Sequence, residues 1–396
     1  MKPASQPAAI RQAQTWAYFL SFIALGLAAA VLGPTLPGLA QQTGSQIGQI
    51  GILFTAQALG NMISSFVSGR LLDRFPAHPL IAVQLLSIAI MLALTPFAGR
   101  LVWLAAIMFV MGAGMGTLDV SGNALLAWIW RQDVAPKLNA LHFFFGLGAL
   151  IAPLVAAQTI TRTSAIAPTY WLLAACVLPL AFIFLRLASP AHDHAAGQSA
   201  AAPPPLLPLL ALVAVFFFYV GAELSFGGWI YTYAVETGLA TAAAAGYLTS
   251  LYWGALTLGR LLTIPIANRI RPRYLLMVDI AGMFASLGLL AVGAGAPTLV
   301  WLAAFGMGLA AANVFPTLIS MAGHNMSLTG STTRWFLIGS SLGSITIPYL
   351  VGQLFARTGP GMMVVCLGLC VFAMTLCFGM FLWSVNPGRR PLPASS

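Results

Sequence analysis

Long runs of apolar residues alternate with short polar or turn-forming segments over nearly the whole chain. Each run is at least about as long as the roughly 20 residues that an α-helix needs to cross the hydrocarbon core of a bilayer. Several runs are longer, which permits tilt. The pattern therefore predicts an all-α integral membrane protein with twelve transmembrane helices. The expected spans are residues 15–40, 46–71, 78–98, 101–130, 137–161, 166–187, 206–236, 241–267, 273–294, 298–325, 329–356 and 361–384.

The first run follows Lys2 and Arg11 and begins near Thr15, an arrangement that resembles a secretory signal peptide. However, the run is long, contains Pro34 and Pro37, and has no clear cleavage site. We therefore expect it to be retained as the first transmembrane helix.

The composition agrees with a bilayer as the main solvent. Of the 396 residues, 60% are hydrophobic and 6% are charged, whereas soluble domains carry about 25% charged residues. The net charge of +10 is spread singly between apolar runs, which argues against nucleic-acid binding. The four cysteines lie inside apolar runs and form neither a disulfide framework nor a metal-ligand cluster. We expect no metal and no cofactor.

The distribution of basic residues predicts the orientation of the chain in the membrane. With the N-terminus in the cytoplasm, thirteen of the 17 lysines and arginines lie on the cytoplasmic side, three lie outside, and Arg260 falls within a span. This asymmetry follows the positive-inside rule and places both termini in the cytoplasm. The short loops and the lack of organelle signals favour a bacterial cell inner membrane.

The two halves of the sequence repeat each other at offsets of about 195 residues. The hexapeptide Leu-Val-Trp-Leu-Ala-Ala occurs at 101–106 and again at 299–304, and Gly148, Pro153 and Gln158 recur as Gly343, Pro348 and Gln353. Such a repeat predicts two six-helix halves related by a pseudo-two-fold axis, with a cavity between them near the midplane. The expected organisation is an N-terminal half at 1–188, a cytoplasmic linker at 189–205 and a C-terminal half at 206–396.

A charged loop follows the second span, with the sequence Ser-Gly-Arg-Leu-Leu-Asp-Arg at 68–74. It resembles the Gly-x-x-x-Asp-Arg signature of the major facilitator superfamily, a resemblance that extends over essentially the whole chain. The resemblance implies a cytoplasmic charge latch formed by Gly69, Asp73 and Arg74, with Arg269 in the matching loop of the second half. The usual basic continuation of the signature is replaced by Phe75 and Pro76, which predicts a weaker latch.

Three segments resemble one branch of that superfamily more narrowly. Residues 112–123 are similar to the fourth helix of the fucose permease branch, and 138–154 and 219–234 are similar to the fifth and seventh helices of sodium-dependent glucose transporter-like members. One position departs from the pattern. Gly33 stands where fucose permease carries an acidic residue in its first helix, so a proton relay of two carboxylates of that kind is in doubt.

Ionisable residues inside the predicted spans are few, and such residues are costly in a membrane and commonly functional. Asp119 lies in span 4 and Glu223 in span 7, so the two halves each offer one acid to the expected cavity. Desolvation favours the neutral form of a carboxyl group, which suits a proton-coupling role. With His142 in span 5, these are the candidate ion-coupling or proton-coupling residues. A salt bridge of Glu223 with Arg260 in span 8 is the structural alternative.

Polar and aromatic side chains supply candidates for the substrate cavity. Amides both donate and accept hydrogen bonds, which suits ligands rich in hydroxyl groups, and aromatic rings can stack on a sugar. Helix packing, capping and an interfacial aromatic belt are the structural alternatives. We interpret Asp279 in span 9 as structural. The cavity candidates are Asn61, Asn123, Asn139, Trp229, Tyr233, Arg260 and Asn313.

These features predict a transporter rather than an enzyme. We expect a monomeric secondary active symporter that moves a small solute, a sugar or polyol, by alternating access with H+ or Na+ coupling. An exporter of amphipathic small molecules is the first alternative. The Gly-Pro pair of antiporter-type fifth helices is missing, since Ala152 precedes Pro153, which favours uptake. A polytopic membrane enzyme is the second alternative, but the sequence has neither a Gly-x-Ser-x-Gly motif nor a nucleotide-binding loop.

Overall fold

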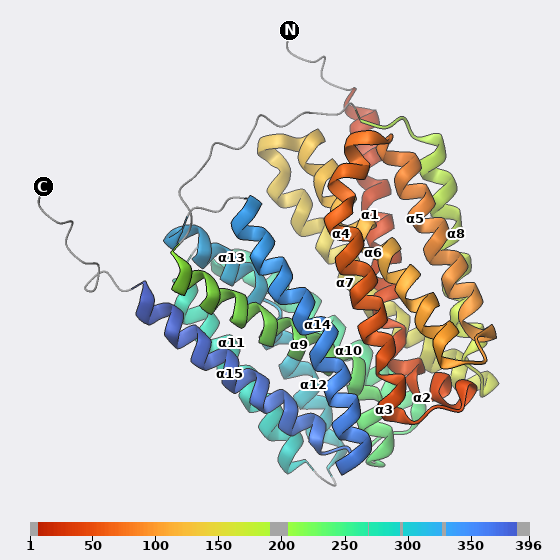
Figure 1. Cartoon of the computed structure of the whole chain (residues 1–396), viewed down its shortest axis with the longest axis vertical. Helices are drawn as coiled ribbons and strands as arrows, with labels where there is room; N and C mark the ends of the chain where they lie inside the picture. The colour runs from red at the N-terminus through yellow and green to blue at the C-terminus, as the bar shows by residue number, and fades with distance from the viewer. Residues whose placement is uncertain (1–6, 191–204, 268, 294–295, 327–329, 386–396) are drawn as a thin grey trace, which may run out of the picture.

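A computed structural model describes residues 7–190, 205–267, 269–293, 296–326 and 330–385, and most of these residues are α-helical (Figure 1). The N-terminal half contains α1 (Ala8–Ala30), α2 (Leu32–Thr43), α3 (Ile47–Ile50), α4 (Ile52–Arg74), α5 (Ala77–Leu94), α6 (Leu101–Trp130), α7 (Val134–Thr163) and α8 (Ala167–Arg186). The C-terminal half contains α9 (Leu206–Glu236), α10 (Ala242–Ala267), α11 (Pro272–Val292), α12 (Pro297–Ala311), α13 (Val314–Asn325), α14 (Gly330–Thr358) and α15 (Met362–Ser384).

The helices confirm the predicted fold class. Within the described residues, eleven helical segments are long and apolar enough to cross a membrane. The eighth expected span is not among those eleven, but it forms the 26-residue helix α10 in the expected place. The expected linker at 189–205 lies largely outside the described residues.

The second expected span is interrupted at Gly51, between α3 and α4, and the first and tenth expected spans are interrupted shortly before a proline. The first span begins earlier than expected, at Ala8, and breaks at Val31 between α1 and α2. The tenth span breaks at Ala312 and Asn313, between α12 and α13. A proline follows each of the breaks in the first and tenth spans, Pro34 and Pro316, and proline has no N–H to continue the helical hydrogen-bond ladder. Buried backbone at such breaks is tolerated in membranes where protein surrounds it or where it lines a cavity.

The internal repeat appears as a repeated helix contact. A Cβ atom on Gly148 of α7 would lie 2.1 Å from the carbonyl oxygen of Ile23 on α1. A Cβ atom on Gly343 of α14 would lie 2.0 Å from the carbonyl oxygen of Phe217 on α9. The backbones therefore touch at matching points in both halves, and only glycine permits this approach. The six-helix halves lie side by side in Figure 1.

Hydrogen bonds between helix ends show which ends of the helices lie together. At the end where α1 begins, the Gln14 side chain donates to the Ala188 carbonyl at 2.9 Å. At the other end, the Gln42 side chain donates to the Thr95 carbonyl at 3.0 Å. We call the first end of the molecule the terminal end.

The two halves meet at the end opposite to the terminal end, which we call the closed end. There the Gln353 side chain of α14 donates to the Gly48 carbonyl of α3 at 2.8 Å. Further towards the middle of the molecule, the Thr55 hydroxyl of α4 donates to the Ile345 carbonyl at 2.7 Å. Figure 1 shows α14 approaching α3 and α4 at this end.

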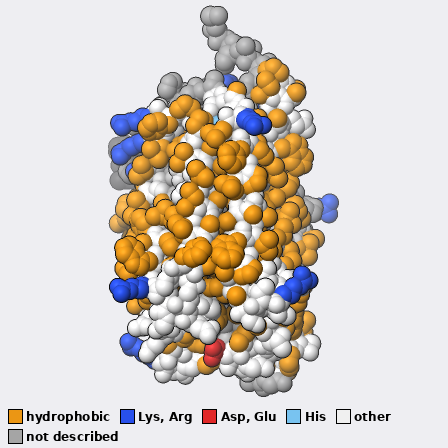
Figure 2. Space-filling model, turned by 90° about the vertical axis from the view of Figure 1, so that its right-hand side faces the viewer, with side chains coloured by type: hydrophobic (Ala, Val, Ile, Leu, Met, Phe, Trp, Pro, Cys, Tyr) orange, Lys and Arg blue, Asp and Glu red, His pale blue; other side chains and the backbone are white. Residues whose placement is uncertain are grey.

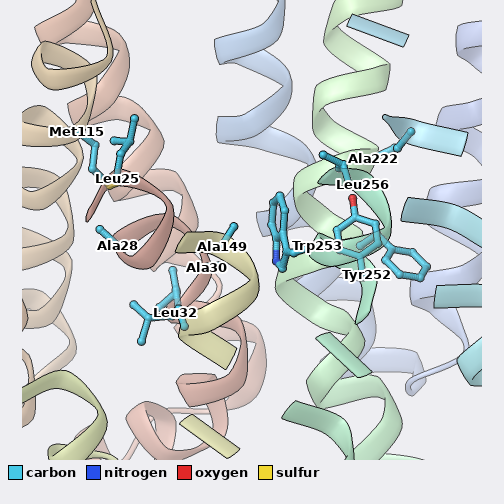
Figure 3. Close-up of a cluster of buried hydrophobic side chains, with 14 of the residues drawn as sticks. Leu25, Ala28, Ala30, Leu32, Met115, Ala149, Ala222, Tyr252, Trp253 and Leu256 are labelled. Carbon is cyan, nitrogen blue, oxygen red and sulfur yellow. The ribbon is translucent and has the colours of Figure 1, made fainter. Parts of the chain in front are cut away.

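The surface and the interior both fit a bilayer. In the view of Figure 2, hydrophobic side chains form a broad belt, and most Lys and Arg side chains in view lie towards its two edges. Figure 3 shows the buried side chain of Leu25 on α1 beside Met115 of α6, and Ala149 of α7 near Ala30. Tyr252, Trp253 and Leu256 of α10 fill the facing part of the C-terminal half.

Candidate functional site

A charged pair lies inside the C-terminal half. The Arg260 Nη2 atom of α10 is 3.7 Å from Oε1 of Glu223 on α9, and the Glu223 side chain is 11% exposed. The structural alternative anticipated for these two residues is therefore present. Arg260 neutralises a carboxylate that would be expensive to hold alone at this depth.

Two tyrosines surround this pair. The Tyr252 hydroxyl donates to the Glu223 backbone carbonyl at 2.9 Å. The Tyr219 hydroxyl donates to the Ala311 carbonyl at 2.9 Å and also lies within hydrogen-bonding reach of the Glu223 carboxyl group. Tyr219 was not among the predicted site residues. Its position four residues before Glu223, on the same helix face, is the signal that would have identified it.

The charged pair also faces the N-terminal half. Arg260 lies within electrostatic range of the His142 ring on α7. The His142 side chain is exposed, and its ring contacts Phe22 edge-on at a centroid distance of 5.9 Å. The structure thus brings His142, Arg260 and Glu223 together across the boundary of the two halves.

Asp119 occupies a separate place in the N-terminal half. Its Oδ1 atom accepts a hydrogen bond from the Asn123 side chain at 3.0 Å, one turn along α6. The Asn123 amide also reaches the Asp119 backbone carbonyl at 2.9 Å. Both side chains are half-buried. Asp119 and Glu223 thus each have a partner within their own half, and no ion pair joins them in the described part of the chain.

An open cavity lies between α7 and α10 towards the terminal end. It has a volume of about 440 Å³ and is lined by Ala135, Pro136, Asn139, Ala140, Phe143 and Leu261. Asn139 lies one helical turn from His142 and is exposed to this space. Asn139 is therefore the one polar residue among the six that line this mostly apolar cavity.

The remaining cavity candidates lie deeper or elsewhere. The Asn61 side chain is half-buried on α4, and its backbone carbonyl accepts a hydrogen bond from Ser65 at 2.8 Å. Asn313 is 7% exposed, at the break between α12 and α13. Tyr233 is 5% exposed near the end of α9.

Trp229 is fully buried and packs at the boundary of the halves instead of lining open space. Its ring centroid lies 5.8 Å from that of Phe54 on α4 and 5.6 Å from that of Phe355 on α14. Its Nε1 atom donates to the Pro348 carbonyl at 2.9 Å. In this conformation the ring seals the closed end, so the expectation that it stacks on a solute is not met here.

The latch candidates lie at the terminal end. Gly69, Asp73 and Arg74 are exposed on the last turns of α4, and Arg269 is exposed in the turn before α11. Asp73 and Arg74 border a second cavity of about 360 Å³, together with Trp128 of α6. Within the described residues, no group of three or more His, Cys, Asp and Glu side chains is placed to hold a metal ion.

Comparison with known proteins agrees with this architecture. The family model of the Major Facilitator Superfamily matches residues 18–348. The chain is 31% identical to sodium-dependent glucose transporter 1 of Rattus norvegicus, over 90% of this chain and 82% of that protein. It is 29% identical to sodium-dependent glucose transporter 1A of Mus musculus, over 96% of this chain and 99% of that protein.

Solved structures show the same fold. The D-xylose–proton symporter superposes with a TM-score of 0.75 at 14% identity, covering 95% of this chain and 98% of that one. With the helix arrangement and the family match, this likeness confirms the fold that the sequence predicts. This chain therefore belongs to the major facilitator superfamily and is a multi-pass membrane transporter.

Proposed function

We propose that the protein is a secondary active transporter that moves a sugar or related polyol across the cell inner membrane, coupled to Na+ or H+. One observation carries the proposal: His142 of one half lies within electrostatic range of Arg260, which pairs with Glu223 in the other half, next to a cavity. Polar groups that meet between two repeats near the midplane are the usual binding arrangement of such transporters. The names of the relatives support a sugar and sodium, and they do not favour the exporter alternative.

The solute recognition that we propose uses amide and imidazole groups. Asn123, Asn139 and His142 can each donate and accept hydrogen bonds, as a hydroxyl-rich ligand requires. Asn139 and His142 are exposed on one face of α7, where a solute can reach them from the cavity. Asn61 and Tyr233 are proposed as outlying contacts that approach the solute in other conformations.

The conformational cycle that we propose is alternating access. The halves touch at the closed end through Trp229, Gln353 and Thr55, while the cavity beside Asn139 lies towards the terminal end. The positive-inside asymmetry favours a cytoplasmic location for the terminal end, so this conformation would open inward. Closure of that end would bring together the latch residues Gly69, Asp73, Arg74 and Arg269.

In the proposed cycle, the charged side chains couple the binding of a proton or cation to closure of the cavity. Enclosing a charged side chain without water is costly, so a carboxylate must be paired or neutralised before the cavity closes around it. Arg260 already neutralises Glu223. In the described part of the chain, the Asp119 carboxyl group is hydrogen-bonded by the neutral amide of Asn123 and pairs with no cation, so Asp119 is the acid that we propose a proton or cation must neutralise.

Uptake of a panel of labelled hexoses and polyols into sealed proteoliposomes, under an imposed Na+ or pH gradient, tests the proposal. Uphill accumulation of one of these solutes under one gradient, abolished by collapsing that gradient, is the expected result. Vesicles in which no member of the panel accumulates under either gradient would refute the sugar and polyol assignment. Downhill equilibration alone would refute the coupling.

A further inference from the structure

Asp279 is a buried acid that the proposed solute site does not use. It lies in the middle of α11 and is 5% exposed. The neighbouring contacts set the register of α11 against α12. A Cβ atom on Gly306 would lie 2.7 Å from the Ser286 hydroxyl, and one on Gly282 would lie 2.9 Å from the Ala310 side chain. Continued one turn further, this antiparallel register places Asp279 opposite Asn313, and the two side chains lie within hydrogen-bonding reach.

These two side chains present oxygen atoms without donors. Within the part of the chain that the structure describes, neither Oδ2 of Asp279 nor Oδ1 of Asn313 has a hydrogen-bond partner, and both atoms are buried. Buried polar atoms are nearly always paired, so two adjacent acceptors without donors are suited to a donor or a cation from outside the chain. The structural role that the sequence suggested for Asp279 gives no reason for the second oxygen.

The interrupted helix beside them supplies further oxygen. Helix α12 ends at Ala311 and α13 begins at Val314. Pro316 has no N–H, so it cannot donate to the Ala312 carbonyl as residue i+4 of a continuous helix would. Broken transmembrane helices elsewhere use such released carbonyls to coordinate Na+.

We propose that Asp279, Asn313 and the Ala312 carbonyl bind a sodium ion. All of these donors are oxygen atoms, which hard cations prefer. The single carboxylate balances one positive charge, which favours a monovalent ion over a divalent one in a low-dielectric interior. The inference rests on the proposed function insofar as this ion is a coupling ion, bound in addition to the proton or cation that neutralises Asp119.

Tyr219 links this site with the charged pair, because its single hydroxyl proton can be donated either to the Ala311 carbonyl or to the Glu223 carboxylate. The Ala311 carbonyl, adjacent to the break, accepts the Tyr219 hydroxyl at 2.9 Å. Tyr219 in turn lies within hydrogen-bonding reach of Glu223, which pairs with Arg260. An ion that draws the carbonyls of the break towards Asp279 therefore acts on Tyr219 and, through it, on the pair that faces the other half.

Sodium binding to the purified full-length protein tests the site without any solute. We would measure the thermal unfolding midpoint and ²²Na+ binding in a K+ buffer titrated with NaCl at constant ionic strength. The expected result is a saturable, Na+-specific stabilisation that Asp279→Asn abolishes. Asn313→Ala keeps the carboxylate and should weaken binding on the order of tenfold or more, the loss typical when a supporting group is removed. Asp133→Asn makes the same chemical change at an exposed residue, so it should bind Na+ normally.

Two results would overturn the site: no Na+-specific effect in the unsubstituted protein, or one that persists in Asp279→Asn. If Asp279→Asn does not fold, unaltered Na+ affinity in Asn313→Ala would overturn it equally. The outcome is independent of the solute. Proton-driven sugar accumulation without Na+ binding would leave the proposed function standing and remove the site. Na+ binding that depends on Asp279, in vesicles that accumulate no sugar, would leave the site standing and remove the proposed function.

Discussion

Arg260 of α10 and Glu223 of α9 form an ion pair with a separation of 3.7 Å inside the C-terminal half. The pair belongs to adjacent helices, yet it faces His142 of the other half. One charge-neutral unit therefore sits at the boundary that must rearrange during transport.

Removing one member of the Glu223–Arg260 pair should destabilise the protein more than removing both members. Glu223→Gln leaves Arg260 without its counter-charge, and breaking a buried pair in this way costs roughly 3–5 kcal/mol when it is fully buried. Since the Arg260 side chain is 27% exposed, we expect a smaller loss here. The double variant Glu223→Gln, Arg260→Gln should unfold at a higher temperature than either single variant.

Thermal unfolding of the four proteins in one detergent measures this coupling as a double-mutant cycle. Glu236→Gln is the matched control, because it makes the same change at an exposed position on the same helix and should leave the midpoint unaltered. Strictly additive effects of the two substitutions would show that the ion pair contributes nothing.

Asp119 should be needed for coupling more than for folding. Asp119→Asn preserves size and can keep a hydrogen bond to Asn123, so we expect a normally folded protein. An amide cannot bind a proton or neutralise a cation, so uphill accumulation of the solute should fall by at least about tenfold. Exchange of labelled for unlabelled solute, at equal concentrations on both sides of the membrane, should persist. Asp133→Asn, at an exposed acid, serves as the control. Uphill uptake at the normal level in Asp119→Asn would exclude Asp119 from coupling.

The transmembrane spans and the main helix contacts were predictable, because the sequence patterns that specify them recur along the chain. Helix length, apolar runs and recurring glycines such as Gly148 and Gly343 specify spans and helix contacts without any knowledge of neighbours. The interruptions were missed because prolines occur in unbroken membrane helices too, as Pro153 does in α7. Whether Pro34 or Pro316 breaks a helix depends on the partners available to the released carbonyls, and a sequence pattern does not contain them.

The sequence predicted which residues belong to the candidate site better than it predicted which of them contact each other. Asp119 with Asn123 follows from a spacing of four on one helix, and the structure contains that contact. Glu223 with Arg260 was foreseen as an alternative, since a buried cation needs a partner. The roles of Tyr219 and Trp229 depend on carbonyls from distant helices, Ala311 and Pro348, which no local pattern reveals.

Trp229 should hold the closed end shut. Its ring packs between Phe54 and Phe355 and donates to the Pro348 carbonyl. Trp229→Ala removes these contacts and should shift the population towards the state open at this end. Spin labels at exposed Gln41 and Thr358, in a background without the native cysteines, would report a longer distance in the variant.

Trp229→Phe distinguishes the contribution of ring packing from that of the hydrogen bond to the Pro348 carbonyl. This variant keeps most of the packing and loses an interaction worth about 1 kcal/mol, so it should show an intermediate shift. An unchanged distance distribution in Trp229→Ala would mean that Gln353 and Thr55 suffice to close the end.

Gly148 and Gly343 should each be difficult to replace, because both lie against the backbone of a facing helix. A Cβ atom at either position would lie 2.0–2.1 Å from a carbonyl oxygen of the facing helix, Ile23 or Phe217. Because backbone cannot move aside as a side chain can, Gly148→Ala and Gly343→Ala should each lower the thermal midpoint by forcing two helices apart. Gly288→Ala is the matched control, since its Cβ would meet nothing within 4 Å and alanine favours helix by roughly 0.5–1 kcal/mol. Equal midpoints for Gly148→Ala and Gly288→Ala would mean that α1 and α7 do not touch as closely as described here.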